Sequence, residues 1–246
     1  MGAKVQHTYC EIKGVKVPVK IYRERRRSFR ASIGRKAAIL RLPISTSKKE
    51  VAARWGWFTD WLHQQFDKNE NLIEHFRPKG YQTGDLLHVG KRTYELNIIY
   101  EDRKTHHGKL ENGKITLKLS KSDTPAHRHK SIQHLLSRVV GHDFLPSITQ
   151  RVEYYNEKHF QKPIKGVKLK YNHSNWGSCS TNGYINLSTR LLFAPDDVID
   201  YVIIHELAHL IEFNHSKKFW QIVQSVMPDY KAKEKWLKDH GGKCRF

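Results

Sequence analysis

The chain has 246 residues, with 44 Lys or Arg against 24 Asp or Glu, so its formal net charge at pH 7 is +20 with histidine neutral. About a quarter of the residues are Leu, Ile, Val or Phe, above the roughly one-fifth below which a highly charged chain stays unfolded, and this excludes an intrinsically disordered protein. Three widely spaced cysteines exclude a disulfide framework, and no run approaches the roughly 18 apolar residues of a bilayer-spanning helix, so we expect a cytoplasmic protein without membrane contact.

The first half of the chain predicts a β-rich region crossed by one helix. Apolar residues alternate with polar ones in short runs, which is the period of a strand with one face in water. These runs lie at 15–21, 29–33, 37–42 and 86–100. Ser47 and Glu50 have the spacing of a capping box before aromatic residues at helical intervals, so we expect a helix over about 48–76. Asn112-Gly113 predicts a tight hairpin.

The second half of the chain is mainly helical in pattern. Apolar residues fall on one helical stripe over about 126–160, with Pro146 as a candidate kink. We expect two short strands, at 167–171 and 184–187, around a polar loop over 172–183. Pro195-Asp196-Asp197 then begins a further helix, because proline and acidic residues suit the first turn.

This last helix carries the sequence His205-Glu206-Leu207-Ala208-His209. His205 and His209 are four residues apart and project from one face, so their ring nitrogens can converge on a cation, while Glu206 can reach a metal-activated water. This is the H-E-x-x-H arrangement of zinc peptidases, in which three protein ligands leave one position open. If these residues were only structural, two histidines and a glutamate on so apolar a helix would be costly without a partner.

A third ligand is required, and the sequence offers two candidates. His215 follows His209 by six residues, the spacing of the third histidine in H-E-x-x-H-x-x-G-x-x-H. Glu212 stands where that pattern has glycine, so we expect Asn214 to adopt the left-handed conformation that returns the chain toward the site. The alternative ligand is Glu234, since other zinc peptidases take a carboxylate from a downstream helix.

The segment Trp176–Ser180, between the two expected strands, has more than one interpretation. It could place a backbone edge beside the metal, where an extended peptide pairs as an added strand, or it could form a turn whose Trp176 fills the core. Cys179 could be a fourth metal ligand or a small buried thiol. By residue type alone, the candidates for an oxyanion donor are His173, Asn175 and Tyr201.

Together these motifs resemble the YgjP-like metal-dependent hydrolases over roughly residues 15–240. The resemblance rests on His205-Glu206-Leu207-Ala208-His209, Asn214-His215-Ser216, Phe219-Trp220, Trp176-Gly177-Ser178-Cys179-Ser180, Pro228-Asp229-Tyr230 and Arg25-Arg26-Arg27-Ser28-Phe29-Arg30. The more distant SprT-like and WLM peptidases have a similar ending to the site. The resemblance implies a zinc peptidase-type lobe in which His205, His209 and His215 bind one catalytic zinc ion and Glu206 is the catalytic base.

We therefore predict an α+β fold with two parts. Residues 1–122 would form a basic, β-rich N-terminal lobe with one long helix, and residues 123–246 a mainly helical, zincin-like metallopeptidase lobe with a small sheet. The pattern is also compatible with one continuous domain.

The basic charge is concentrated near the N-terminus, where residues 1–80 hold 18 basic and 7 acidic side chains. Tyr22 and Phe29 are interleaved with cations that could contact nucleic-acid phosphates while the rings stack on bases. These cations are Arg23, Arg25, Arg26, Arg27, Arg30, Arg35 and Lys36. In an alternating strand, however, such charges would lie on both faces, and a merely solvated sheet explains them as well.

The sequence thus predicts a zinc-dependent metallopeptidase that hydrolyses peptide bonds of a protein or peptide substrate through a metal-activated water. Two alternatives use the same residues differently. One is a metal-dependent hydrolase of nucleotide phosphoanhydrides, and the other is a nucleic-acid-binding module in which the metal is structural.

Overall fold

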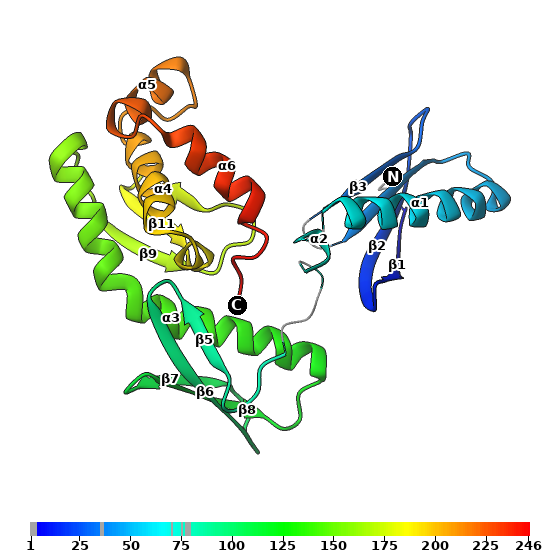
Figure 1. Ribbon diagram of the computed structural model, residues 1–246, viewed down its shortest axis with the longest axis horizontal. Helices are drawn as coiled ribbons and strands as arrows, with labels where there is room; N and C mark the ends of the chain where they lie inside the picture. Colours follow the sequence, from blue (N-terminus) through cyan, green and yellow to red (C-terminus); the bar gives the residue numbers. More distant parts are fainter. Residues whose placement is uncertain (1–3, 35–36, 70, 75, 77–79) are drawn as a thin grey trace. The chain divides into compact units, whose positions relative to one another are not determined.

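The computed structural model describes residues 4–34, 37–69, 71–74, 76 and 80–246. The chain divides into two compact units, Met1–Pro78 (the N-terminal unit) and Lys79–Phe246 (the C-terminal unit) (Figure 1). Helices alternate with small sheets in the C-terminal unit and cover a sheet in the N-terminal unit, which confirms the predicted α+β class. None of the helices in these described ranges is both long and apolar enough to pass through a bilayer.

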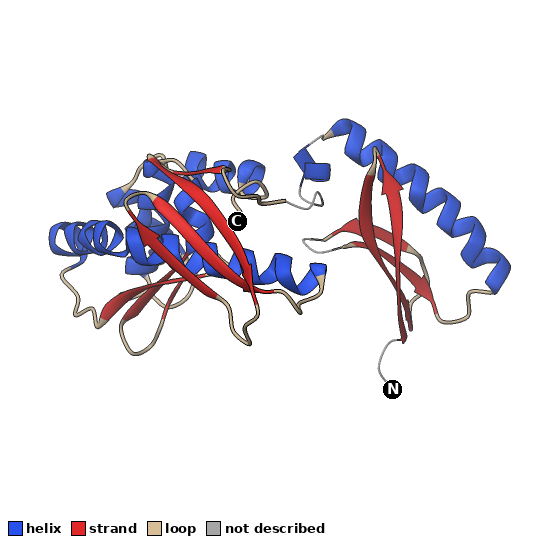
Figure 2. Cartoon of the chain, turned by 90° about the horizontal axis from the view of Figure 1, so that it is seen from below, coloured by secondary structure: helices blue, strands red, loops and turns tan. Residues whose placement is uncertain are grey.

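The N-terminal unit is a four-stranded sheet with a helix along one side (Figure 2). Its elements are β1 (Lys4–Ile12), β2 (Val15–Glu24), β3 (Arg30–Ile33), β4 (Ala38–Pro43), α1 (Lys48–Lys68) and α2 (Asn71–Glu74), and the strand order is β1-β2-β4-β3. Alternation along β2 buries every second side chain, and these apolar residues share a core with Phe58, Leu62 and Phe66 of α1. The predicted capping box begins α1, since Ser47 and Glu50 each accept the other's backbone N–H.

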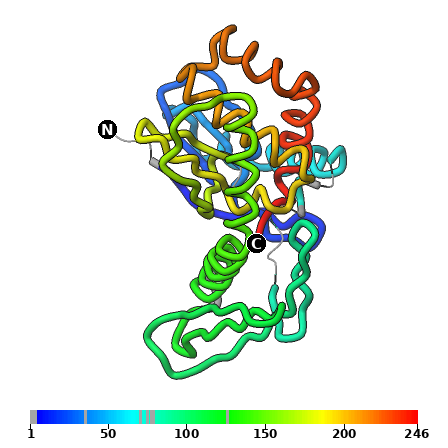
Figure 3. Tube along the Cα trace, turned by 90° about the vertical axis from the view of Figure 1, so that its left-hand side faces the viewer, coloured from blue at the N-terminus to red at the C-terminus, as the bar shows by residue number. Residues whose placement is uncertain are grey.

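The C-terminal unit contains two sheets connected by a long helix. Its elements are β5 (Leu86–Val89), β6 (Arg92–Glu101), β7 (His107–Glu111), β8 (Lys114–Ser120), α3 (Pro125–Tyr155), η1 (Asn156–Phe160), β9 (Gly166–Lys170), β10 (Gly177–Cys179), β11 (Tyr184–Ser188), η2 (Thr189–Phe193), α4 (Asp196–Ala208), α5 (Lys217–Val226) and α6 (Tyr230–His240). The sheet orders are β5-β6-β8-β7 and β10-β11-β9. Figure 3 follows α3, in green, from the first sheet toward the segments that carry the second.

The boundary between the units differs from the predicted one. The sequence analysis divided the chain after residue 122, whereas the compact units divide after Pro78. The reason is burial, because Leu96 and Leu117 of the first sheet are fully buried in the same core as Leu136 of α3. The change of composition near residue 122 therefore marks a loop within one core.

Most predicted elements are present with shifted ends. The Asn112-Gly113 hairpin is confirmed, since both residues have positive φ, 48° and 77°, between β7 and β8. The helix expected over 48–76 ends at Lys68, because the next residue is extended. The helix expected over 126–160 is α3, which continues through Pro146 and ends in the π-helical turn η1.

Two strands are absent from the sequence predictions. One is β1, which pairs with β2 along its whole length. The other is β10, a three-residue strand inside the segment expected to be a polar loop. Neither strand has the apolar alternation by which a strand is predicted from sequence, and pairing with a neighbouring strand stabilises each of them.

Because α3 belongs to the core of the C-terminal unit, truncating one of its buried side chains should lower the free energy of unfolding. Leu136→Ala removes a fully buried side chain and should lower the free energy of unfolding by about 2–5 kcal/mol, measured by urea denaturation. The matched control is Leu86→Ala, because Leu86 on β5 is 61% exposed and its loss should change stability by less than about 0.5 kcal/mol. Equal effects at the two positions would contradict the assignment of the core.

Candidate functional site

Helix α4 places the first two candidate ligands at its C-terminal end. The helix begins at Asp196, as predicted, and its first turns are tied to α3 by Arg151, which donates to Asp196 Oδ1 at 2.8 Å and to Asp200 Oδ1 at 2.9 Å. Nearly every apolar residue of α4 is buried, so the helix has one fixed orientation in the core. His205 lies in its last turn and His209 is its C-cap residue.

The structure brings the three predicted histidines together. The ring centroids of His205, His209 and His215 are 4.8–5.1 Å apart, and one nitrogen of each lies within 4.8 Å of the other two. The Nε2 atoms of His205 and His215 are 3.0 Å apart. His209 Nδ1 lies 3.2 Å from the Glu212 carbonyl oxygen, which accepts its proton and leaves the lone pair of His209 on Nε2.

This donor set fits a zinc ion. Zn–N distances of about 2.0–2.1 Å in a tetrahedron require nitrogens roughly 3.4 Å apart, close to the separation of the His205 and His215 nitrogens. His205 Nδ1 is buried without a hydrogen-bond partner among the described residues, so coordination at Nε2 would give this ring a polar partner while Nδ1 stays unpaired. Burial, with smaller contributions from the other two histidines, lowers the pKa of His205 to about 3, so the ring is neutral and has a lone pair at pH 7.

Aromatic side chains support the three rings from behind. Phe219 of α5 is fully buried, and its ring centroid lies 4.9, 4.5 and 4.8 Å from those of His205, His209 and His215. Trp220 lies 5.8 Å from His215 in a stacked orientation. Phe219 is therefore core packing behind the histidines.

Glu206 lies one position round the helix, against the strand β10. Its side chain is nearly buried, 5% exposed, and it accepts a hydrogen bond from the backbone N–H of Cys179. Burial raises the pKa of Glu206 to about 8, although the Cys179 N–H opposes the shift. A Cβ added to Gly177 would lie 2.5 Å from Glu206 Oε1, so glycine is what allows the strand to approach the carboxylate.

Arg190, which the sequence analysis missed, fixes the segment that leads into β10. Its guanidinium is buried and donates to the backbone oxygens of Cys244 and Gly241, both at 2.7 Å, and of His173 at 3.3 Å. It also lies over the Trp176 ring, 4.5 Å from the centroid. No local motif predicts this role, because the hydrogen-bond partners of Arg190 come from segments far apart in the sequence.

Other predicted residues lie outside the histidine group. Neither Glu234 nor Cys179 belongs to it among the described residues, and Glu234 is exposed on α6. Burial raises the pKa of the Cys179 thiol to about 11, which is typical of an inert thiol. The expectation for Asn214 is wrong, since it does not have positive φ, and the turn is made by N–H groups of Ile211 and Glu212 that donate to the Ala208 oxygen.

A second group of possible ligands occurs in the described part of the chain, at His106, Asp123 and His127. His106 Nε2 lies 2.6 Å, and His127 Nδ1 2.9 Å, from the Asp123 carboxylate. The Ser120 backbone N–H donates to His106 Nδ1, so the proton of neutral His106 is on Nε2. Both nitrogens of His106 therefore lie beside polar partners, and the three residues form a polar cluster before α3.

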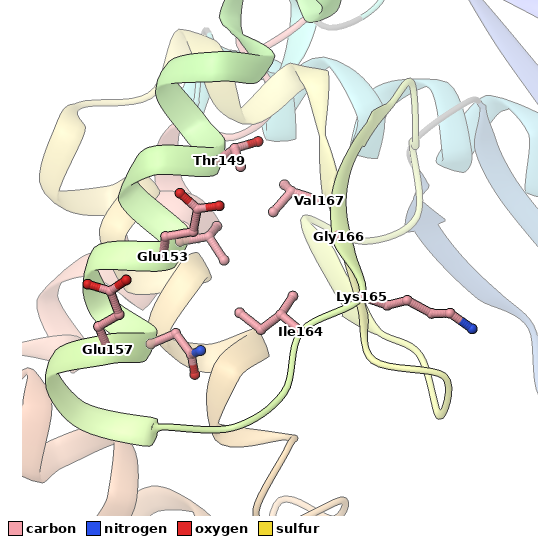
Figure 4. Close-up of a pocket in the computed structure, with 9 residues that line it drawn as sticks. Thr149, Glu153, Glu157, Ile164, Lys165, Gly166 and Val167 are labelled. Atoms are coloured by element: carbon pink, nitrogen blue, oxygen red, sulfur yellow. The ribbon is translucent and has the colours of Figure 1, made fainter.

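A cavity of about 300 Å³ lies between the end of α3 and β9 (Figure 4). It is lined by Thr149, Val152, Glu153, Asn156, Glu157, Ile164, Lys165, Gly166 and Val167. Its lining includes none of the three histidines and not Glu206, so it is separate from the candidate metal site.

Comparison with known proteins assigns the chain to a family. The profile of the family described as "YgjP-like, metallopeptidase domain" matches residues 27–240. The chain belongs to the YgjP-like family. Within this YgjP-like chain, an 80-residue segment is 30% identical to the UTP pyrophosphatase of Escherichia coli (strain K12), covering 32% of this chain and 48% of that protein.

A solved structure also matches part of the YgjP-like chain. It is the crystal structure of the metallopeptidase zymogen of Pyrococcus abyssi abylysin, 29% identical, with a TM-score of 0.34. The match covers 36% of this chain and 89% of that chain. The family match is thus the comparison that covers both units, while the two named relatives correspond to about a third of the chain.

The contact between β10 and Glu206 predicts the effect of a methyl group at Gly177. Gly177→Ala should displace the Glu206 carboxylate from the Cys179 N–H and lower the free energy of unfolding by about 1–3 kcal/mol, measured by urea denaturation. In the control Gly56→Ala, on α1, the new Cβ meets no atom within 4 Å and the helix should be stabilised by up to about 1 kcal/mol. A neutral Gly177→Ala would show that the strand does not press on the carboxylate.

Proposed function

We propose that the chain is a zinc-dependent metallopeptidase. In this proposal His205, His209 and His215 bind one zinc ion and Glu206 is the catalytic base. The observation that carries it is the meeting of three imidazole nitrogens within 4.8 Å beside a buried glutamate. Membership of a metallopeptidase-domain family supports the broader class of metal-dependent hydrolase.

The roles of the residues follow from their positions. A zinc ion held by the three imidazoles would supply Lewis acidity, polarising the scissile carbonyl and lowering the pKa of water toward about 7. Glu206 would take a proton from the attacking water and return it to the leaving nitrogen, serving first as base and then as acid. The Cys179 N–H holds the carboxylate in place for both steps.

The edge strand β10 supports a peptide as the substrate. The Trp176 oxygen and the Ser180 N–H both bond to β11, so the intervening Gly177 and Cys179 direct their backbone groups away from that strand. Since the Cys179 N–H is taken by Glu206, an extended peptide added at this edge would form backbone hydrogen bonds with Gly177 and with the Cys179 oxygen. The wide, irregular spacing of the three cysteines supports a reducing, cytoplasmic location.

A second candidate function is hydrolysis of a nucleotide phosphoanhydride. It is favoured by the 30% identity to a UTP pyrophosphatase, although the match spans only 48% of that protein. The same Lewis acid and the same base would serve a phosphoryl oxygen and its leaving group. The two candidates differ in substrate and share the site.

Substitution of the base tests the mechanism. Wild-type protein should cleave unfolded casein, and Glu206→Gln should lower that rate at least about 100-fold while about one equivalent of zinc is retained, because Gln cannot carry the proton. The matched control is Glu212→Gln, since only the backbone oxygen of Glu212 contacts His209. Full activity of Glu206→Gln would contradict the mechanism, and release of pyrophosphate from UTP without proteolysis would replace the first candidate by the second.

A metal-binding measurement distinguishes the two candidate third ligands. His215→Ala should weaken zinc binding by more than the roughly 10–100-fold that loss of an outer-shell contact costs, measured by competition with a chromophoric chelator. Glu234→Ala, which removes an exposed carboxylate outside the histidine group, should bind zinc as the wild type does. The opposite result would make Glu234 the third ligand.

A further inference from the structure

The sheet of the N-terminal unit has one face that no helix of that unit covers. Figure 2 shows α1 along one side of the four strands and the other side open. The buried side chains of β2 and β4 all belong to the core under α1, so the alternate residues of these strands lie on the second face. We call this second face the open sheet face.

Strand register identifies the residues of the open sheet face. Residues opposite each other in a pair share a face, which links Tyr9 with Pro18, Lys20 with Ile39, and Tyr22 with Arg41. The cations on this face come from three of the four strands. They are Lys16 and Lys20 of β2, Arg30 of β3 and Arg41 of β4.

Four of the strand cations therefore share the open sheet face, whereas Arg23 of β2 lies opposite the buried Leu42 on the core side, so alternation does divide the predicted basic run. The other inward positions of β2, Val15, Val17, Val19 and Ile21, are all buried. The consecutive residues Arg25–Arg27 lie in the loop between β2 and Arg30, the first residue of β3, and so add positive charge next to the open sheet face. Arg35 and Lys36, the remaining cations of the predicted basic run, lie outside the described residues.

Two aromatic rings on the open sheet face are paired with cations. Lys16 Nζ lies 5.2 Å from the centroid of the Tyr9 ring, and the Arg41 guanidinium lies 4.7 Å from that of Tyr22. Tyr9 is 60% exposed, so its ring is accessible to a planar group. Since Tyr9 is opposite Pro18, the two rings are four residues apart along the strands, or about 13 Å.

Acidic residues are few on the open sheet face and lie at its ends. Glu11 is opposite Lys16 near the β1–β2 turn, and Glu24 is at the last position of β2, where it pairs with Arg41. Residues 1–78 as a whole hold 17 basic and 7 acidic side chains, a net charge of +10. The partner must therefore be a polyanion that also presents planar rings.

We propose that the open sheet face binds single-stranded nucleic acid, with Tyr9 stacking on a base and Lys16 and Lys20 contacting phosphates. A single strand exposes both the faces of its bases and a regular row of charges, whereas a duplex hides the base faces that the tyrosines would contact. This surface shares no residue with the histidine site. It therefore holds whether or not the proposed hydrolase activity is correct.

The test is binding of the full chain to a fluorescein-labelled oligothymidine of about 16 nucleotides, followed by anisotropy between about 50 and 200 mM salt. Tyr9→Ala should weaken binding at least about fivefold, and Tyr9→Phe should retain it, because stacking needs the ring and not the hydroxyl. Lys16→Gln/Lys20→Gln should reduce the slope of log K against log salt by about 1.4, since each lost phosphate contact contributes about 0.7.

Matched controls separate this surface from general charge. Tyr154→Ala removes a tyrosine that is 52% exposed and also lies under a lysine, Lys158, but in the C-terminal unit. Lys48→Gln/Lys49→Gln removes two exposed charges from α1, on the other side of the sheet. Both controls should bind as the wild type does. Binding of an equally long duplex as tightly as the single strand, a Tyr9→Ala effect below twofold, or an equal slope change in the α1 control would overturn the proposal.

Discussion

The site depends on placing a buried carboxylate beside two partly buried imidazoles and a third, His215, that is exposed. His205 and Glu206 are adjacent on a buried turn of α4, and burial shifts both pKa values toward the neutral form, to about 3 and about 8. Burying such a pair in an apolar core costs free energy unless another group compensates for the lost solvation. A divalent ion on the histidine nitrogens is the simplest compensation, since it needs neutral imidazoles and stabilises a nearby carboxylate.

The surrounding structure serves that arrangement. Phe219 contacts all three histidine rings, which limits their rotation. On the other side, Gly177 lets β10 approach Glu206. Arg190 holds the segment before β10 through the His173 oxygen and the Trp176 ring, and bonds the C-terminal segment through two further backbone oxygens. The site is thus built from a helix, a turn and an edge strand that are each fixed by separate contacts.

The sequence predicted the grouping of the three histidines better than the division into units. Spacing of four along a helix fixes the relation of His205 to His209, and the spacing to His215 follows a known pattern, so the group could be foreseen from local geometry. The turn between His209 and His215 could not be foreseen, because hydrogen bonds to the Ala208 oxygen form it and Asn214 is not left-handed. The role of Arg190 could not be predicted for a related reason, since its hydrogen-bond partners are distant in the sequence. The predicted boundary differs from the observed one because composition does not show which side chains share a core. Leu117 and Leu136, on opposite sides of the predicted boundary, do share one.

X-ray absorption at the zinc edge of the zinc-loaded protein would test the central claim most directly. The account predicts first-shell scatterers at about 2.0–2.1 Å, all nitrogen or oxygen, with the multiple scattering of three imidazoles. A sulfur scatterer at about 2.3 Å, as from Cys179, or a signal that fits fewer than three imidazoles, would contradict it.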